Sequence, residues 1–265
     1  MKLLNFELPP DGFKRLFYDI ETSPNIGFFW GAGYKVNISH DNIIKERAII
    51  CICYKWEGQD TVHSIEWNKG CDKALLSHFM EVAKTADELV AHNGDNFDEK
   101  WIRTRCLVHG IECPPKLNSY DTLKKTRTHF RFNSNRLDYL GKILLREGKI
   151  NTNFDLWKRI CLDNEPSAMR EMVQYCKKDV ELLERIWKKL APYDTPKTHA
   201  GVFAGLDRWT CPHCASENVK VSKTRPTPKG IVQKQMQCKD CHRYYTIANK
   251  VYKDYVVAKF PQEST

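Results

Sequence analysis

Short apolar runs in the first 120 residues have the length and composition of β-strands. They are rich in β-branched and aromatic residues, and turn-forming or helical segments separate them. The Glu-Gly-Gln sequence at 57–59 joins two of the runs as a predicted hairpin turn. The runs that we predict as strands are residues 15–21, 48–56, 61–67, 88–92 and 117–120.

Helical spacing of apolar residues dominates the rest of the first 190 positions. Residues 72–84 carry apolar side chains at intervals of three and four. A longer amphipathic helix is predicted from an N-cap at Ser167 to Leu190. Its apolar stripe consists of Met169, Met172, Cys176, Val180, Leu183 and Trp187. The shorter predicted helices are residues 98–109, 121–128 and 137–146.

The order of these elements predicts the fold class. Three successive strands followed by alternating helices and strands indicate an α/β fold with a mixed sheet flanked by helices. Residues 191–205 contain two prolines, two glycines and no periodic pattern, which is typical of a linker. We therefore predict one domain at residues 1–190, a linker at 191–205 and a small second domain at 206–265.

The composition argues against a membrane protein and against a disordered chain. Of the 265 residues, 42% are hydrophobic and 28% are charged, as in ordinary soluble proteins. No apolar run approaches the ~20 residues that a bilayer span requires, and residues 1–10 lack the pattern of a secretory signal. We expect a cytoplasmic protein that does not associate with membranes.

The 11 cysteines agree with a reducing compartment. Seven of them are scattered through apolar or helical patterns, such as Cys51 and Cys53 in the sequence AIICICY. An odd number of cysteines without regular spacing is not typical of a disulfide framework. We therefore expect these seven to be reduced, buried thiols.

Positive charge is concentrated near the C-terminus. The formal net charge is +9, yet residues 195–265 hold 12 Lys and Arg against 5 Asp and Glu, whereas the first 194 residues hold 30 and 28. A nearly neutral body with a basic C-terminal module suits a polyanionic partner. Simple solubility is the alternative explanation.

Acidic residues occur at positions where an α/β fold can form a site. Asp19 and Glu21 are two apart on a predicted strand, so both side chains point to the same face. Two acids on a buried strand repel each other and lose hydration, and therefore need a cation. The alternative is a strand that simply ends in solvent. Asp95 and Asp98 follow the strand at 88–92, at the sheet edge where such sites usually lie.

The long helix adds a third acidic position, and the three together resemble a known family. Tyr175 and Asp179 are four residues apart, on one helical face. The sequences FYDIET, HNGDNFDEKW and YCKKDVELL resemble, in this order, the three motifs of the DEDD superfamily of 3′–5′ exonucleases. The second resembles its form in proofreading domains of family-B DNA polymerases, and the third the subtype called DEDDy. The resemblance covers about residues 14–190 and implies a DnaQ-like exonuclease with an RNase H-like fold.

The resemblance also implies a site for two metal ions. The ligands would be Asp19, Glu21, Asp98 and Asp179, with Asp95 as the alternative to Asp98. Carboxylates without sulfur or imidazole select Mg²⁺ or Mn²⁺. Two such ions activate a water and stabilise the leaving 3′-oxygen during attack on phosphorus.

Other residues in and beside the motifs are expected to serve the substrate. Tyr175 would orient the attacking water, because a phenol with a pKa near ~10 is a poor base. Thr22, Asn93 and Phe97 are expected near the terminal nucleotide by the same resemblance.

Two further features border the motifs. The aromatic run Phe28, Phe29 and Trp30 follows the first motif in a glycine-containing loop. If these rings are exposed, they would stack on unpaired bases. If they are buried, they would only fill the interior of the loop as a plug. Asp121 stands where a predicted strand meets a helix, and we interpret it as a helix cap, with support of the site as the alternative.

Four cysteines near the C-terminus have metal-ligand spacing. Cys211, Cys214, Cys238 and Cys241 form the pattern C-x₂-C-x₂₃-C-x₂-C. This pattern resembles a zinc ribbon, in which four thiolates hold one structural Zn²⁺. A module of this size has little core of its own, so the metal is needed for its folding.

Basic and aromatic residues surround these cysteines. If zinc only stapled a small domain, they would have no particular purpose, whereas phosphate and base contacts would use both charge and stacking surface. The residues concerned are Lys220, Lys223, Arg225, Lys229, Lys234, Arg243, Tyr244 and Tyr245. Lys223, Arg225, Lys229, Arg243 and Tyr244 are our candidates for nucleic-acid contact.

These features predict a 3′–5′ exonuclease that hydrolyses DNA from single-stranded 3′ ends, with the ribbon assisting binding. The alternatives are a 3′–5′ exoribonuclease, which uses the same site, and a non-catalytic adaptor for nucleic acid or a polymerase. A DNA polymerase or another replication protein is the expected protein partner.

Overall fold

The computed structural model describes residues 13–31, 33, 38–115, 117–147 and 153–260. The chain divides into two compact units, Arg15–Leu190 and a second unit that begins at Ala191 and also includes Phe13 and Lys14. The division falls where the first predicted domain ends. The extreme ends of both predicted domains, residues 1–12 and 261–265, lie outside the described residues.

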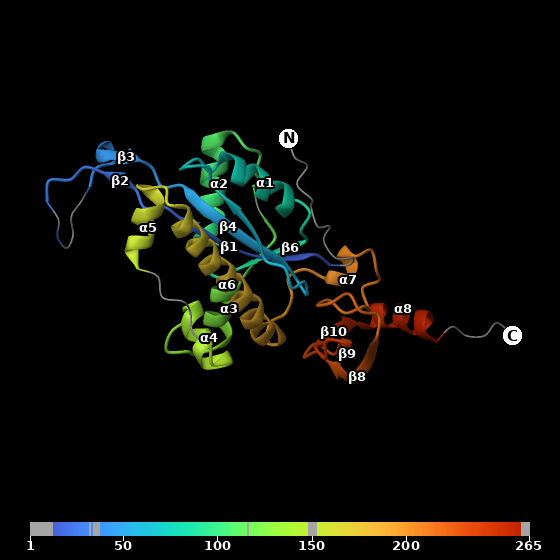
Figure 1. Ribbon diagram of the computed structural model, residues 1–265. Helices are drawn as coiled ribbons and strands as arrows, with labels where there is room; N and C mark the ends of the chain where they lie inside the picture. Colours follow the sequence, from blue (N-terminus) through green and yellow to red (C-terminus); the bar gives the residue numbers. More distant parts are fainter. Residues whose placement is uncertain (1–12, 32, 34–37, 116, 148–152, 261–265) are drawn as a thin grey trace. The chain divides into compact units, whose positions relative to one another are not determined.

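A five-stranded mixed sheet forms the centre of the first unit (Figure 1). Its order is β5-β4-β1-β6-β7, with β1, β4 and β5 antiparallel and with β6 and β7 parallel to β1. The predicted α/β fold with a mixed sheet flanked by helices is confirmed. The strands are β1 Arg15–Thr22, β4 Ile49–Trp56, β5 His63–Glu66, β6 Glu88–Ala91 and β7 Ser119–Asp121.

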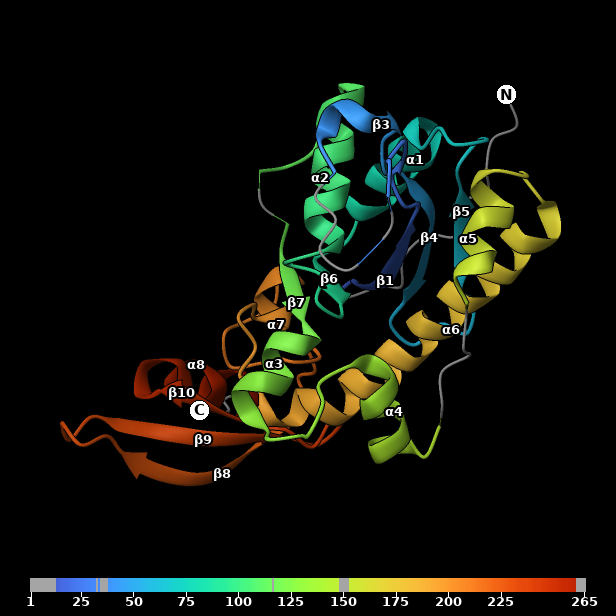
Figure 2. The ribbon, with the colours of Figure 1, turned by 90° about the vertical axis from the view of Figure 1, so that its left-hand side faces the viewer.

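Helices cover both faces of this sheet because its central strands are apolar on both sides. Phe17 packs edge-to-face on Trp187 of the longest helix, α6, with ring centroids 5.4 Å apart. Its neighbour Tyr18 points the other way and packs on Phe79 of α1, also at 5.4 Å. Odd-numbered residues of β1 therefore face α6. Figure 2 shows α6 on one side of β1 and β4 and α2 on the other. The helices are α1 Lys73–Ala83, α2 Asp98–His109, α3 Thr122–His129, α4 Leu137–Leu145, α5 Phe154–Cys161 and α6 Pro166–Leu190.

The structure adds elements that the apolar pattern did not predict. A small two-stranded sheet, β2 Ile26–Gly27 with β3 Ile43–Lys45, and the short helix η1 His40–Asn42 interrupt the connection from β1 to β4. Helix α5 was also not predicted. No helix in the described ranges is both long enough and apolar enough to cross a membrane.

The second unit is built on a three-stranded antiparallel sheet of order β10-β9-β8. Its core gathers Trp209, Val219, Met236, Ile247 and Tyr255 around two of the four closely spaced cysteines. The strands and helices are β8 Val219–Pro226, β9 Val232–Cys238, β10 Tyr244–Ala248, η2 Ala191–Tyr193, α7 Ala200–Phe203 and α8 Asn249–Lys259.

Residues 191–205, expected as a linker, are packed into this second unit. They contain η2 and α7, and the backbone N–H of Ala200 donates to the carbonyl of Pro212 at 3.0 Å. A Cβ at Gly201 would lie 1.9 Å from Oγ1 of buried Thr210. Glycine is therefore needed at 201 for close packing rather than for chain flexibility.

Candidate active site

Strand β1 presents its two carboxylates to α6. Asp19 and Glu21 continue the odd-numbered face that begins with Phe17, and helix α6 brings Asp179 to the same place. One oxygen from each carboxylate can be chosen so that all three lie within 4.8 Å of one another. Asp179 is only 4% exposed. This carboxylate cluster of Asp19, Glu21 and Asp179 unites the first and third predicted motifs.

The electrostatics of the carboxylate cluster favour a bound cation. Burial raises the pKa of Asp19 well above its usual value, and its neighbours Cys176, Asp98, Glu21 and Asp179 raise that pKa further. A carboxylate that is costly to ionise alone becomes stable as an anion beside a divalent ion. All donors in the cluster are carboxylate oxygens, which fit Mg²⁺ or Mn²⁺.

Asp98 lies next to the carboxylate cluster but outside it. It is the first residue of α2, it is 2% exposed, and its Oδ1 accepts the backbone N–H of Ile20 at 3.3 Å. Strand β6 pairs with β1 only from Arg15 to Phe17, so the Asp98 carboxylate occupies the edge of β1 beyond that pairing. Burial raises the pKa of Asp98 to about 7, although hydrogen bonds from backbone N–H groups favour its anion and act to lower this pKa.

The raised pKa of Asp98 predicts a stability difference that depends on pH. Because the group titrates near 3.8 when unperturbed and at about 7 in the folded protein, the folded state binds the extra proton between these values. Below about pH 4 this proton makes its full contribution to the free energy of unfolding. As the pH rises to 7, that contribution is lost, and the free energy of unfolding falls by up to roughly 4 kcal/mol.

Chemical denaturation of wild type and Asp98→Asn from pH 4.5 to 8, with magnesium withheld, measures this effect. The free energy of unfolding of wild type should fall relative to that of the variant as the pH rises, and added Mg²⁺ should reduce the fall. A difference that stays constant across the range would contradict the assignment.

Asp95, the alternative to Asp98, is engaged elsewhere. Its Oδ1 accepts from the Ser119 hydroxyl at 2.6 Å, and its Oδ2 lies 2.7 Å from Nζ of Lys124. Both oxygens therefore already have neutralising or donating partners near the surface. The geometry favours Asp98 as the residue that supports the cluster.

The remaining motif residues surround the carboxylates in different ways. Tyr175 is half-buried one helical turn before Asp179 on α6. Asn93 has a left-handed backbone, with φ 67°, and its N–H donates to Oδ1 of Asp121 at 2.9 Å. The backbone carbonyl of Thr22 accepts from the indole N–H of Trp157 at 3.0 Å.

Two other residues singled out in the sequence lie immediately before helices. Phe97 is half-buried at the start of α2. Asp121 caps α3, because its side chain accepts from the backbone N–H groups of Leu123 and Lys124. The cap interpretation of Asp121 therefore agrees with the structure.

A cavity of about 600 Å³ opens beside the carboxylates. Asp19, Asp179 and Asn93 line it together with Arg127 and Arg136, which are exposed. The two arginines belong to α3 and to the residue preceding α4, and the sequence motifs did not point to them. Guanidinium groups facing a carboxylate-lined cavity suit contact with substrate phosphates.

The aromatic run after the first motif is exposed. Relative exposures are 77% for Phe28, 56% for Phe29 and 106% for Trp30. A buried plug, one of the two expectations, is therefore wrong. The rings are available for stacking.

The four cysteines of the second unit meet the geometric test for zinc. Their sulfur atoms lie within 4.8 Å of one another, with 3.6 Å between Cys211 and Cys241 and 3.7 Å between Cys214 and Cys238. Zinc bound tetrahedrally at ~2.3 Å from each sulfur separates neighbouring sulfurs by about 3.8 Å. The observed spacing fits this donor set.

The residues expected to contact nucleic acid differ in availability. Lys223, Arg225, Lys229 and Tyr244 are exposed, the first two on β8. Arg243 is half-buried, and its Nη1 lies 3.1 Å from Nδ1 of His213.

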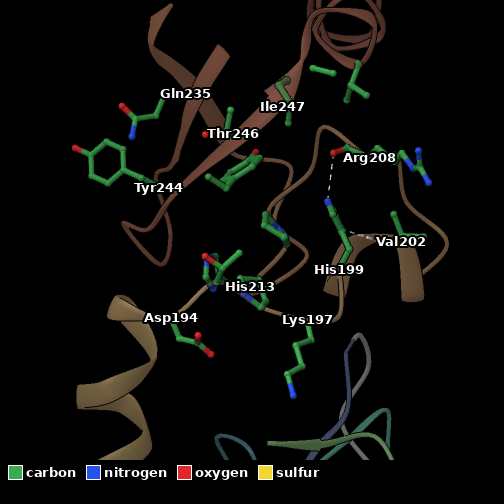
Figure 3. Close-up of a pocket in the computed structure, with 16 residues that line it drawn as sticks. Asp194, Lys197, His199, Val202, Arg208, His213, Gln235, Tyr244, Thr246 and Ile247 are labelled. Carbon is green, nitrogen blue, oxygen red and sulfur yellow. Dashed lines mark hydrogen bonds between the residues drawn. The ribbon is translucent and has the colours of Figure 1, made fainter. Parts of the chain in front are cut away.

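A second cavity, of about 640 Å³, lies within this unit (Figure 3). Tyr244, Gln235 and Thr246 line it from the sheet, and His199 and His213 line it from the preceding segments. His199 donates from Nε2 to the carbonyl of Arg208 and accepts at Nδ1 from Val202 N–H, so both ring nitrogens are occupied. Burial lowers the pKa of His199, which agrees with a neutral ring.

The comparison with protein families matches the first unit. The family model RNase_H_2, described as RNase_H superfamily, matches residues 16–191. A DNA polymerase from Thermococcus hydrothermalis is 29% identical over 119 residues, which cover 40% of this chain and 6% of the polymerase.

A solved structure shows the same fold. The family B DNA polymerase of the hyperthermophilic archaeon Pyrobaculum calidifontis is similar with a TM-score of 0.52 and 15% identity, over 69% of this chain and 25% of the polymerase chain. This chain thus spans only 6% and 25% of the length of these two polymerases.

Proposed function

Because this chain belongs to the RNase H superfamily, we propose that it is a metal-dependent 3′–5′ exonuclease of the DEDDy type acting on DNA. The observation that carries the proposal is the convergence of Asp19, Glu21 and Asp179 within 4.8 Å. Carboxylates at this separation repel one another as anions, and a divalent cation bound between them offsets that repulsion.

Asp19, Glu21, Asp98 and Asp179 would hold two Mg²⁺ or Mn²⁺ ions. When bound, these ions supply an activated water and neutralise charge on the phosphate and on the leaving 3′-oxygen. Tyr175, one turn from Asp179, orients the water through its hydroxyl. Arg127 and Arg136 do not bind the metal ions. Their guanidinium groups hold the phosphates of the nucleic-acid strand.

The choice between Asp98 and Asp95 gives a direct prediction. Asp98→Ala is expected to lower nuclease activity by about a hundredfold or more, because one of the four proposed metal ligands is lost. Asp95→Ala should change activity less than threefold or so, since this surface carboxylate pairs with Lys124. Rates of nucleotide release from a 5′-labelled oligonucleotide measure both, and the reverse order would make Asp95 the functional residue.

DNA is the preferred substrate in this proposal. The similarity to two DNA polymerases supports it, and the exposed rings of Phe28, Phe29 and Trp30 suit unpaired bases. Rates on single-stranded DNA and RNA of identical sequence test the choice. Faster release from RNA would favour the exoribonuclease, and no release from either would favour the non-catalytic adaptor.

We further propose that the second unit holds one structural Zn²⁺ through Cys211, Cys214, Cys238 and Cys241 and assists nucleic-acid binding. Lys223 and Arg225 on β8 and Lys229 just after it are exposed and available for contact with phosphates. A DNA polymerase or another replication protein remains the proposed protein partner, because the matched relatives are polymerases.

Charge reversal on the second unit tests this binding role. Lys223, Arg225 and Lys229 replaced together by glutamate should weaken single-strand binding. They should also flatten the dependence of log K on log salt by about 0.7 per lost phosphate contact, roughly 2 in all. Salt titrations of fluorescent oligonucleotide binding measure the slope.

A matched triple variant controls for net charge. Lys69, Lys73 and Lys100 are also exposed but lie in the first unit. Their replacement by glutamate should leave the slope closer to that of wild type. Equal effects of the two triple variants would mean that overall charge, and not the second unit, governs binding.

A further inference from the structure

Three cysteines lie beside the carboxylate cluster, and the proposed reaction does not use them. Cys51, Cys53 and Cys176 are each 0% exposed. Their sulfur atoms all lie within 4.8 Å of one another. Two come from β4 and the third from α6, so tertiary packing creates this thiol cluster.

The register of the sheet places the thiol cluster on the face that carries the carboxylates. Cys53 pairs with Asp19, and Cys51 pairs with Glu21. Directly opposed residues of antiparallel strands share one face. The thiols of β4 therefore stand beside the carboxylates of β1, under the same helix.

Cys176 joins the thiols to the active site. Its sulfur lies 3.4 Å from the carbonyl oxygen of Asp19 and 3.8 Å from Oδ2 of the same residue. It is also three residues before Asp179 on α6, so both side chains lie on neighbouring positions of one helical face. A change at the thiol cluster thus reaches Asp19 by direct contact.

The donor set of the thiol cluster suits a soft metal ion. An ion bound at ~2.3 Å from three sulfurs in a plane separates them by about 4 Å, within the spacing of the cluster. Thiolates select Zn²⁺ or Cu⁺ over Mg²⁺. A tetrahedral ion at ~2.3 Å from sulfur and ~2.1 Å from a carboxylate oxygen separates these two atoms by about 3.6 Å. Oδ2 of Asp19 lies 3.8 Å from Cys176 Sγ, so it is within reach as a fourth ligand.

We infer that Cys51, Cys53 and Cys176 bind one thiophilic metal ion, with Asp19 as the fourth ligand. Asp19 lines the 600 Å³ cavity, which provides the route of entry. Resting on the proposed function, the inference adds that such an ion inhibits the nuclease, because it withdraws Asp19 from the Mg²⁺ ligands. Binding releases the thiol protons to solvent and requires no oxidant.

Cadmium is a suitable probe, because it takes the place of zinc and gives a near-ultraviolet absorption for each thiolate bound. The full chain is saturated with Cd²⁺ in a phosphine reductant, and thiophilic ions per chain, zinc and cadmium together, are counted by native mass spectrometry. Wild type should bind one more ion than Cys53→Ser or Cys176→Ser, whatever the ribbon cysteines hold. Cys106→Ser, which removes a buried thiol outside the cluster, should bind as many as wild type.

Inhibition is followed with Mg²⁺ present and each protein compared with its own cadmium-free rate. Wild type and Cys106→Ser should lose activity by about tenfold or more at saturating Cd²⁺, and Cys53→Ser should need at least about tenfold more Cd²⁺ for the same loss.

Either of two results overturns the inference. One is equal ion counts for wild type, Cys53→Ser and Cys176→Ser. The other is inhibition of wild type and Cys53→Ser at the same Cd²⁺ concentration. If a variant fails to fold, the cadmium–thiolate absorption of wild type still tests the inference. That absorption must correspond to three bound thiolates in addition to those of Cys211, Cys214, Cys238 and Cys241, and a smaller number contradicts the site. The ion count does not need activity, so failure of the proposed nuclease function would be recognised separately.

Discussion

Asp19→Asn is expected to abolish nucleotide release and, at the same time, to make the metal-free protein more stable. Burial and the neighbouring acids raise the pKa of Asp19, so its anion is costly in the folded state. The neutral amide removes this cost, and we expect a higher free energy of unfolding than for wild type at pH 7.5 without Mg²⁺.

The same substitution removes a ligand from the carboxylate cluster. Charge stabilisation by bound ions is worth several kcal/mol, so a loss of ~4 kcal/mol would slow hydrolysis by about a thousandfold. Denaturant titration and oligonucleotide degradation measure the two effects on one preparation. Asp138→Asn, which lines the same cavity outside the cluster, should change neither by a comparable amount. An inactive but destabilised Asp19→Asn would indicate a structural carboxylate instead.

Cys238→Ser is expected to unfold the second unit and leave the first folded. Cys238 is fully buried in the small core of this unit and is one of its four closely spaced sulfurs. Structural zinc contributes on the order of 10 kcal/mol to folding of such modules, more than a core of this size can replace.

Hydrogen exchange resolved along the chain measures this result. Amides of β8, β9 and β10 should lose protection in the variant, while those of β1 and β4 keep it. Activity on a short oligonucleotide should persist, whereas binding of long strands should weaken. Cys161→Ser removes a buried thiol of the first unit. It is the control for the effect of replacing any buried thiol by a hydroxyl. Undiminished protection in β9 of Cys238→Ser would show that the four cysteines are not a folding site.

The elements that the sequence predicted well are those with a strong local pattern. β1, β4 and α6 combine apolar runs or a clear stripe with sharp ends, and their observed bounds differ from the predicted ones by one or two residues. Asp19 and Glu21 were expected on one face because strand geometry alone fixes that relation. Motif order then indicated Asp179 as their partner.

Other features depend on contacts between distant segments. Arg127 of α3 and Arg136, which precedes α4, both line the cavity, and no local pattern marks those arginines. Cys51 and Cys53 were recognised as buried thiols, yet their meeting with Cys176 follows from the packing of α6 on β4. Residues 191–205 have the composition of a linker, but Gly201 and Ala200 use small size for packing.

Degradation of 5′-labelled single-stranded DNA tests the central claim most directly. With Mg²⁺ or Mn²⁺, wild type should produce a ladder that shortens one nucleotide at a time from the 3′ end. Neither wild type with both ions withheld nor Asp179→Asn with Mg²⁺ should produce it. An intact strand in both metals, or an undiminished ladder from Asp179→Asn, would contradict the account.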